Sequence, residues 1–394
     1  MSDKSSEKVA RKARNGSDYS IRAVVRACDI LRCFPRADVM LSLGEVAGRS
    51  KLSLATAYRL LQTLVTCGML DSLGKNRYGL SSQHWQHKRY RFGYASQSEE
   101  FSFSRLVSDS IRSSAYDAGV DLLVLNNCYS PKNAIRNADI FVREHVDLVI
   151  EFQTNHQSAS IVASKLMEAG IPIIAIDIPH PGAAYYGANN YRAGLIGGHA
   201  LAQACLREWN GQIDEVVLLE LPMAGPLPRS RLTGMLAGVR EQLHSLPDQK
   251  VLFLDGNGRF EKSLDIMRRY LRRSKSRHIL LGALNDPSCL GALQAFEEAG
   301  RAEHCLAVAH NSSIEARREM RRPGSRLVGS VGFFPEKYGE SVISLALDKV
   351  RGKEIPSATF IKHHLITSEN VNTFYPNDNL ITSADSDSLL FSQH

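Results

Sequence analysis

Residues 41–80 read LSLGEVAGRSKLSLATAYRLLQTLVTCGMLDSLGKNRYGL. Apolar residues recur at helical spacing over 43–48 and again over about 54–67, and Gly68 follows the second of these segments. The second segment carries its apolar residues at the spacing i, i+3, i+4, i+7 and i+8: Ala57, Leu60, Leu61, Leu64 and Val65. These signals predict a short helix, a turn and a longer helix in succession.

The flanking sequence extends this pattern. A further helix is expected over about 20–34, where Pro35 stops it. On the other side, 69–72 and 77–80 are short extended pieces separated by the turn sequence LGKN, which is typical of a hairpin. The order helix, short helix, turn, helix, hairpin is that of a winged helix-turn-helix, predicted over 19–80.

The net charge is concentrated at this end of the chain. Of the net +7, residues 1–90 carry 16 Lys and Arg against 7 Asp and Glu, which is +9 and leaves −2 for the remainder. Residues 1–18 form a basic arm without apolar periodicity, which predicts disorder. The excess positive charge indicates an anionic partner, usually nucleic acid, although a basic tail that only improves solubility is the alternative.

The predicted third helix has an inner face for packing and an outer face for the DNA major groove. Short hydroxyl side chains near its start can reach phosphates, and a longer guanidinium can reach a base edge. Two cations in the hairpin are expected along the adjacent DNA backbone or minor groove. The candidate DNA-binding residues are Ser53, Ala55, Thr56, Tyr58, Arg59, Lys75 and Arg77. A winged helix used only for dimerisation or protein contact is the alternative.

The segment 20–80 resembles the DNA-binding domain of IclR-type transcription regulators. Those proteins show a recognition helix like AYRLLQTL, then a Gly, then a short wing that ends in a strand like YGL. The chain differs at Lys51, where the family usually has Gly in the turn, and at Ala55, where it often has Ser. The resemblance implies a transcription regulator that binds double-stranded operator DNA.

Residues 81–89 are polar and read as a linker, and the pattern changes beyond them. Short apolar runs alternate with amphipathic helices, which predicts an α/β fold with parallel sheets covered by helices on both faces. Residues 376–394 are polar and predict a flexible tail. The expected strands are 90–95, 121–125, 148–152, 173–177, 215–221, 251–254, 278–283, 305–309 and 326–332.

Residues 90–375 resemble type I periplasmic binding proteins, the group of ribose-binding protein and the LacI sensor domain. The resemblance implies a sensor of two lobes, the first about 90–190 and 336–363, the second about 191–335 and 364–375. Five stretches in the family's order carry it: AGIPIIAID (169–177), ANNYRAG (188–194), RSRLTGMLAGV (229–239), ALNDPSCLGALQAFEEAG (283–300) and VGFFPEKYGESVISLALDKVRGKEIP (331–356).

Ligands of open α/β sheets bind outside the carboxyl ends of the strands, and polar residues stand at those ends here. Carboxylates, amides and a guanidinium beside aromatic faces suit a polyol, whose hydroxyls both donate and accept hydrogen bonds. Each strand-end Asp or Asn has the alternative role of a helix cap. By the resemblance, Asp177, Arg229 and Asn285 also fall on ligand positions of the family. The candidate ligand-binding residues are Phe101, Phe103, Phe152, Asp177, Asn190, Arg229, Asn285, His310, Asn311 and Phe333.

Several positions depart from the sugar-binding pattern of the family. Ile178 stands where an Arg often follows the Asp, and Asn311 stands where an Asp is common. Phe152 and Phe333 fall where polar residues are found, and Gly256–Gly258 replaces an aromatic residue. The predicted pocket is therefore less charged than the family's, and a pentose or hexose is expected first, with another small polar ligand as the alternative.

Other classes of protein are disfavoured. No run of 18 apolar residues and no N-terminal apolar segment is present, so neither a membrane span nor a secretory signal is expected, and a free periplasmic receptor is excluded. The seven cysteines form no metal or disulfide framework. Gly194, Gly197 and Gly198 do not make a phosphate loop, HExxH and GxSxG are absent, and His363–His364 reads as structural. No catalytic residue, cofactor or metal is predicted.

These observations predict a cytoplasmic transcription regulator, a repressor, that acts as a homodimer or higher homo-oligomer. Its operator binding is controlled by a small polar effector, a sugar by first expectation, in the cleft between the lobes. Two alternatives remain: a sugar-modifying enzyme, and a DNA-binding protein whose large domain only oligomerises.

Overall fold

The computed structural model describes residues 21–35, 39–74, 76–81, 90–244 and 246–378. The chain divides into two compact units, 1–89 and 90–394. The predicted arm 1–18, the linker except Ser81, and the tail beyond Asp378 lie outside the described residues.

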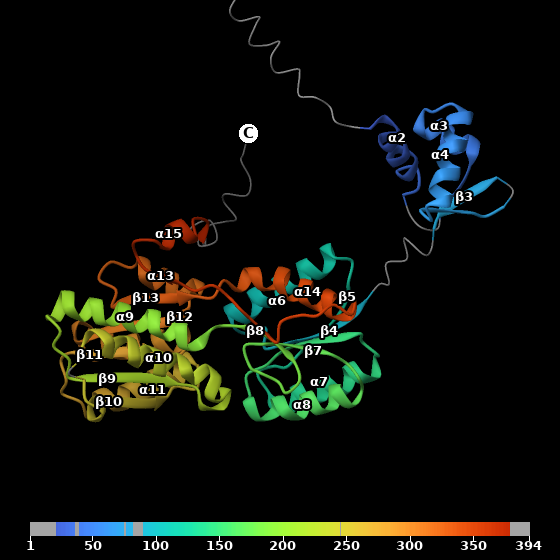
Figure 1. Cartoon of the computed structure of the whole chain (residues 1–394). Helices are drawn as coiled ribbons and strands as arrows, with labels where there is room; N and C mark the ends of the chain where they lie inside the picture. The colour runs from blue at the N-terminus through green and yellow to red at the C-terminus, as the bar shows by residue number, and fades with distance from the viewer. Residues whose placement is uncertain (1–20, 36–38, 75, 82–89, 245, 379–394) are drawn as a thin grey trace, which may run out of the picture. The chain divides into compact units, whose positions relative to one another are not determined.

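The first unit is small, with three helices and a three-stranded antiparallel sheet of order β1-β3-β2 (Figure 1). Its core contains Ile30, Val46, Leu61 and Tyr78, each at most 3% exposed. The sequence did not predict β1, a three-residue strand that pairs with β3 on the side away from β2. Its elements are α2 (Arg22–Leu31), β1 (Met40–Ser42), α3 (Leu43–Ser50), α4 (Leu54–Thr66), β2 (Leu70–Ser72) and β3 (Arg77–Leu80).

Side-chain caps fix where α3 and α4 begin. Ser42 accepts a hydrogen bond from the Glu45 amide, while the Glu45 carboxylate accepts one from the Ser42 amide, so the two form a capping box. Ser53 caps α4 by accepting from the Thr56 amide at 3.3 Å. Between the helices, Lys51 has a φ of 53°, the left-handed conformation that Gly adopts most easily. The helix-turn-helix geometry therefore follows from local sequence.

The second unit has two lobes, each a six-stranded sheet between two layers of helices (Figure 1). The first lobe's sheet has the order β14-β8-β7-β6-β4-β5 and is wholly parallel. Its strand β6 is buried at every position, as expected when α6 and α14 cover one face and α7 and α8 the other. The elements are β4 (Arg91–Ser96), α6 (Ser102–Asp117), β5 (Asp121–Asn126), α7 (Pro131–Arg143), β6 (Leu148–Phe152), α8 (His156–Glu168), β7 (Ile173–Ile176), β8 (Ala184–Gly187), α14 (Tyr338–Val350) and β14 (Ala358–Phe360).

The second lobe's sheet has the order β10-β9-β11-β12-β13-β15, and only the edge strand β15 is antiparallel. Helices α9 and α10 cover one face, and α11, α12 and α13 cover the other. The elements are α9 (Asn190–Trp209), β9 (Glu215–Glu220), α10 (Pro226–Gln242), β10 (Val251–Asp255), α11 (Phe260–Leu271), β11 (Ile279–Ala283), α12 (Asp286–Glu298), β12 (Cys305–Asn311), α13 (Ile314–Arg321), β13 (Leu327–Gly332), β15 (His364–Ile366) and α15 (Val371–Phe374), with short 3-10 turns at 222–224, 248–250, 302–304 and 335–337.

The chain crosses between the lobes three times, at 188–189, 333–337 and 361–363. The Asn189 amide donates to His363 Nε2 at 3.1 Å and so ties two crossings together. The predicted fold class is confirmed, although the short strands β8, β14 and β15 beside the crossings were not predicted.

Close packing of α9 against α10 orients the start of α10. A Cβ atom added at Gly194 would lie 1.9 Å from the Arg231 carbonyl oxygen, and one at Gly198 would lie 2.1 Å from that of Met235. Only glycine permits this approach, which explains the glycines that form no phosphate loop. The consequence is that Arg231 is held at a fixed place beside the cleft.

The ordered chain extends slightly beyond the predicted sensor boundary at 375. Asp378 is buried and accepts hydrogen bonds from Arg317 at 2.7 Å and from Arg321 at 2.8 Å. Residues 376–378 therefore belong to the second lobe rather than to a flexible tail.

Candidate ligand-binding cleft and DNA-binding helix

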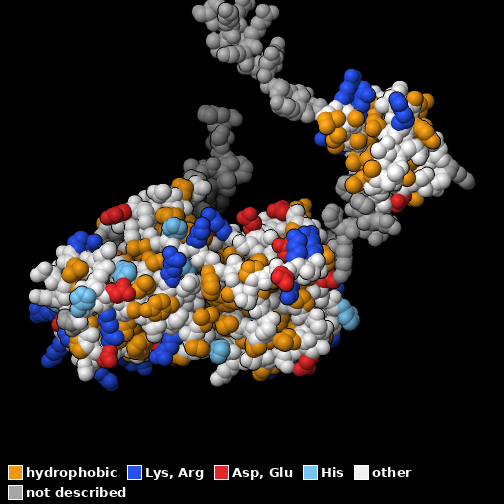
Figure 2. Space-filling view, viewed as in Figure 1, with side chains coloured by type: hydrophobic (Ala, Val, Ile, Leu, Met, Phe, Trp, Pro, Cys, Tyr) orange, Lys and Arg blue, Asp and Glu red, His pale blue; other side chains and the backbone are white. Residues whose placement is uncertain are grey.

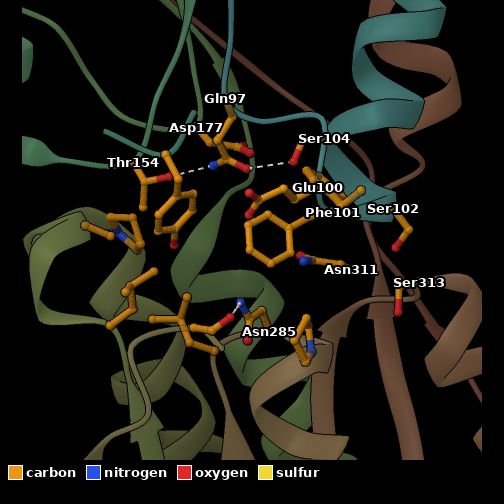
Figure 3. Close-up of a pocket in the computed structure, with 18 of the residues that line it drawn as sticks. Gln97, Glu100, Phe101, Ser102, Ser104, Thr154, Asp177, Asn285, Asn311 and Ser313 are labelled. Atoms are coloured by element: carbon orange, nitrogen blue, oxygen red, sulfur yellow. Dashed lines mark hydrogen bonds between the residues drawn. The ribbon is translucent and has the colours of Figure 1, made fainter. Parts of the chain in front are cut away.

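A cavity of about 400 Å³ lies between the two lobes of the second unit, at the carboxyl ends of the strands (Figure 3). This is where ligands of open α/β sheets bind. Its walls come from the loops that follow β4, β5, β6 and β7 in one lobe and β9, β10, β11 and β12 in the other. The lining residues are Gln97, Glu100, Phe101, Ser102, Phe103, Ser104, Arg105, Tyr129, Gln153, Thr154, Asp177, Ile178, Leu221, Ala224, Pro228, Arg231, Gly258, Phe260, Glu261, Leu284, Asn285, Pro287, Leu290, Asn311, Ser313 and Glu315.

Asp177 follows β7 in a left-handed conformation, with a φ of 60°. Its Oδ1 is shielded from solvent and has no hydrogen-bond partner within the described part of the chain. Burial raises the pKa of this carboxyl group to about 6, against the opposing effect of the Arg231 charge. A strained backbone and an unsatisfied acceptor together mark a place prepared for a donor group, such as a ligand hydroxyl.

Arg231 is the guanidinium of the cleft, and it is only 5% exposed. Its Nε donates to Asn190 Oδ1 at 2.5 Å, and its Nη1 donates to the Leu284 carbonyl oxygen at 3.0 Å. The guanidinium carbon lies 4.6 Å from the centre of the Phe333 ring. Burial lowers the pKa of Arg231, and the Asp177 carboxylate opposes that effect. The fold thus holds a buried cation beside an unsatisfied carboxylate.

Polar side chains on the first lobe form a connected network at the cleft wall. Gln97 donates from Nε2 to Thr154 Oγ1 at 2.6 Å and accepts at Oε1 from Ser104 Oγ at 3.0 Å (Figure 3). Sequence reasoning missed these three residues. The signal that could have found them is position, because Gln97 follows β4 directly and Thr154 follows β6 in the same way.

Five of the ten predicted ligand-binding residues line the cleft, and five do not. The five lining residues are Phe101, Phe103, Asp177, Asn285 and Asn311. Phe152 lies behind the wall, with its ring centre 6.4 Å from that of Phe103. Asn190 and Phe333 contact Arg231 instead of the cavity. His310 is buried with its Nδ1 2.9 Å from the Ala283 carbonyl oxygen.

Arg229 is the fifth residue placed outside the cleft. Its Nε donates to Glu220 Oε2 at 3.2 Å, its guanidinium lies 5.3 Å from the centre of the Phe253 ring, and its side chain is 54% exposed. Two residues further along α10, the helical rotation of about 200° turns Arg231 into the cleft. The sequence RSR offered both arginines, and the helical phase that separates them is visible only in the fold.

Asn285 combines both roles that its position allowed. Its Oδ1 accepts from the Ser288 amide at 3.1 Å and so caps α12, while its Nδ2 donates to the Gly258 carbonyl oxygen at 2.9 Å at the cleft (Figure 3). The cap holds the side chain in place before any ligand arrives.

The two lobes touch across the mouth of the cleft. Ser102 Oγ of the first lobe donates to Glu315 Oε2 of the second at 3.0 Å. The Arg259 guanidinium of the second lobe lies 5.7 Å from the Phe101 ring centre and 5.1 Å from that of Tyr129 in the first. The structure therefore shows the lobes closed around the cavity.

In the first unit, α4 exposes the side predicted to face DNA. Ser53, Ala55, Tyr58 and Arg59 are exposed, and Thr56 is partly exposed. The opposite side of the helix is buried at Ala57, Leu61 and Leu64. Arg77 at the start of β3 is also exposed, whereas Lys75 lies outside the described residues.

Two structural searches concern sites of other kinds. Across the described ranges, no group of three His, Cys, Asp or Glu side chains has the arrangement of a metal site. Likewise, no helix in the described part of the chain is long and apolar enough to cross a membrane.

The fold and the two sites define a helix-turn-helix unit followed by a two-lobed binding-protein unit. The model of the periplasmic binding protein domain family matches residues 92–354, more than half of the chain, and the chain belongs to that family. The IclR helix-turn-helix domain model matches residues 23–74, so the resemblances inferred from sequence are confirmed. Neither is an enzyme family. No curated protein matches the chain.

Solved structures of solute-binding proteins share the two-lobed fold. One from Actinobacillus succinogenes with bound D-allose is 19% identical, with a TM-score of 0.62, 72% of this chain covered and 99% of that one. One from Bacillus halodurans with bound myo-inositol is 18% identical, with a TM-score of 0.62 and coverages of 73% and 98%. One from Mycobacterium smegmatis in complex with β-D-fucofuranose is 19% identical, with a TM-score of 0.65 and coverages of 74% and 96%. These likenesses establish the fold.

Proposed function

We propose that the protein is a transcription repressor of the cytoplasm whose hold on operator DNA is controlled by a small ligand in the cleft. The observation that carries this proposal is the union, in one chain, of an IclR helix-turn-helix domain with a cleft that contains an unsatisfied Asp177 beside a buried Arg231. The first binds DNA in its family, and the second needs a polar ligand to complete its hydrogen bonds.

The ligand is a sugar in this proposal. A polyol matches the cleft because each hydroxyl can donate to Asp177 or accept from Arg231, and Phe101 offers a ring face for the apolar side of a pyranose. The bound D-allose, myo-inositol and fucofuranose of the similarly folded proteins support the same chemistry. Asn285 and Asn311 supply further groups that both donate and accept.

Ligand binding acts by shifting the equilibrium between open and closed lobes. The effect on DNA is limited by the difference in ligand affinity between the two states. Closure alters how two DNA-binding units of an oligomer can be placed on paired half-sites, and this change is the proposed route to release of the operator.

A homodimer is proposed through the exposed apolar face of α2. Ile21 and Val24 are 68% and 55% exposed, and Val25 and exposed Cys28 continue the face at helical spacing. Figure 2 shows apolar side chains gathered on the surface of this unit. A maleimide crosslinker should join Cys28 of two copies when Cys67 and Cys128 are replaced by Ser, and Val24→Asp should prevent it. A monomer in solution would contradict this interface.

The experiment that tests the function couples both sites. An operator is first selected from random duplexes, and its affinity for the full chain is measured by fluorescence anisotropy with and without each member of a sugar panel. We expect at least one sugar to weaken operator binding by about tenfold or more, the usual size of allosteric coupling. Sugar binding without any change in operator affinity would contradict regulation. Turnover of a sugar would favour the alternative of a sugar-modifying enzyme, for which no observation speaks here.

A further inference from the structure

The cleft has an apolar region that the sugar-binding pattern does not require. Ile178, Leu221, Ala224 and Leu284 line the cavity, and all four belong to one packed cluster with exposures of 2–6%. Ile178 comes from the first lobe and the others from the second. Pro228 of α10 also lines this part of the cavity. We name these five residues the apolar patch.

The apolar patch begins next to the polar pair. Ile178 follows Asp177 in the chain, and the carbonyl group of Leu284 accepts the hydrogen bond from Arg231. A ligand atom group bonded to Asp177 and Arg231 therefore has apolar side chains as its next neighbours. A charged residue at position 178 would have hydrated this place, and isoleucine does not.

The patch also extends toward Asn285. A Cβ atom added at Gly258 would lie 3.2 Å from Leu221 Cδ2, 3.1 Å from Asn285 Nδ2 and 3.5 Å from the Tyr129 hydroxyl oxygen. The absence of a side chain at Gly258 keeps the space between Leu221 and Asn285 open. An apolar group of the ligand thus has room against Leu221 while a neighbouring hydroxyl reaches the amide.

Another side of the cavity has the opposite character. Ser102, Asn311 and Ser313 lie together there, in a region lined by hydroxyl and amide groups (Figure 3). The cavity is therefore polar on one side and apolar on another, and a ligand that fits it has the same division.

We propose that the effector is a deoxy sugar, a hexose in which a methyl group replaces the terminal hydroxymethyl group and lies against the apolar patch. This inference rests on the proposed function, in which the ligand is a sugar. The ring hydroxyls meet Asp177, Arg231 and the polar side of the cavity. A hydroxyl at the methyl position would lose its water without gaining a partner among Ile178, Leu221 and Ala224, so the parent sugar binds more weakly.

The test compares matched pairs of sugars on the full chain. The pairs are 6-deoxy-L-galactose with L-galactose, 6-deoxy-L-mannose with L-mannose, 6-deoxy-D-galactose with D-galactose, and 6-deoxy-D-glucose with D-glucose. Thermal shift identifies the pairs that bind, and titration calorimetry gives both dissociation constants. For the best pair, we expect the deoxy member to bind about tenfold to a hundredfold more tightly, the range by which an apolar pocket rejects an added hydroxyl.

Matched variants locate the selectivity. Ile178→Thr keeps a β-branched side chain and adds a hydroxyl to the patch, so the preference should fall about fivefold or more. Ile343→Thr is the control, because Ile343 is equally buried at 3% exposure but lies in the core on α14, away from the cleft. It should lose stability and keep the preference.

The outcomes separate this inference from the function on which it rests. Equal or tighter binding of the parent sugar in the best pair overturns the deoxy sugar and leaves sugar sensing intact. An unchanged preference in folded Ile178→Thr overturns the role of the apolar patch. If that variant does not fold, the ratio measured on the unaltered chain still decides. If no sugar of either kind binds, the proposed function itself fails, and this inference with it.

Discussion

The outer face of α4 and the wall of the cleft hold their polar groups in opposite environments. Tyr58 and Arg59 on α4 stand in solvent, where water satisfies them. Arg231 in the cleft is buried, and Asp177 beside it keeps an oxygen with no partner in the described structure. A solvated group contributes little to folding, whereas a buried charge is coupled to the stability of its whole lobe. Substitutions should therefore separate function from stability on α4 and affect both together in the cleft.

The largest effect is expected at Arg231. Arg231→Ala removes the partner of Asn190, leaves the Leu284 carbonyl group unsatisfied and leaves Asp177 without a compensating charge. The loss of stability should be about 3–5 kcal/mol, and sugar binding should disappear. Arg229→Ala, two residues away on the same helix, breaks only an exposed pair and should cost about 0.5 kcal/mol or less. Chemical denaturation of both variants gives the comparison. Similar losses in the two would refute the burial argument.

Asp177 should show the next largest effect, and its sign is opposite. A carboxyl group with a pKa raised from 3.8 to about 6 holds its proton more tightly in the folded chain, so folding loses free energy as the pH rises through that window. Asp177→Asn has no proton to lose, so it should be more stable than the unaltered protein by about 2–3 kcal/mol at pH 7 and by little at pH 4.

The same substitution should weaken sugar binding at least tenfold, because the charged acceptor is gone. Denaturation at several pH values measures the stability difference, and calorimetry measures the affinity. A difference that stays constant between pH 4 and pH 7 would show that Asp177 does not titrate as proposed.

Arg59 tests the solvated side of the comparison. Arg59→Ala should weaken operator binding by about 1–3 kcal/mol if the guanidinium reads a base edge. Its unfolding midpoint and its affinity for the sugar should stay as they are, since the side chain is exposed. Anisotropy on the selected operator and on a scrambled duplex distinguishes a base contact from a phosphate contact. An unchanged affinity for both duplexes would remove Arg59 from the DNA interface.

The same contrast explains how far sequence alone could predict the molecule. The α4 face follows from local periodicity and the Ser53 cap, so its exposed residues were visible in the pattern. All nine predicted strands of the second unit are present, because each is a continuous apolar run. The unpredicted strands β8, β14 and β15 have three or four residues each, too few for a periodic signal.

The cleft was predicted only in part because its residues depend on contacts distant in sequence. Arg231 enters the cavity because α9 and α10 meet through Gly194 and Gly198, a packing that the pattern RSR does not encode. Gln97 and Thr154 meet although 57 residues separate them. Strand ends predict where a ligand binds, and helical phase decides which side chain meets it.

The smallest expected effect concerns Lys51, in the turn before α4. Its φ of 53° costs a non-glycine residue about 1 kcal/mol, and the IclR pattern usually has Gly there. Lys51→Gly should therefore stabilise the first unit by at most about 1 kcal/mol, since glycine also gains freedom in the unfolded chain. Lys51→Ala is the matched variant, because it removes the same charge and keeps the strained backbone. If Lys51→Ala stabilises the unit as much as Lys51→Gly, the charge rather than the left-handed turn is the source of the cost, and unfolding of the full chain monitored at the first unit decides between them.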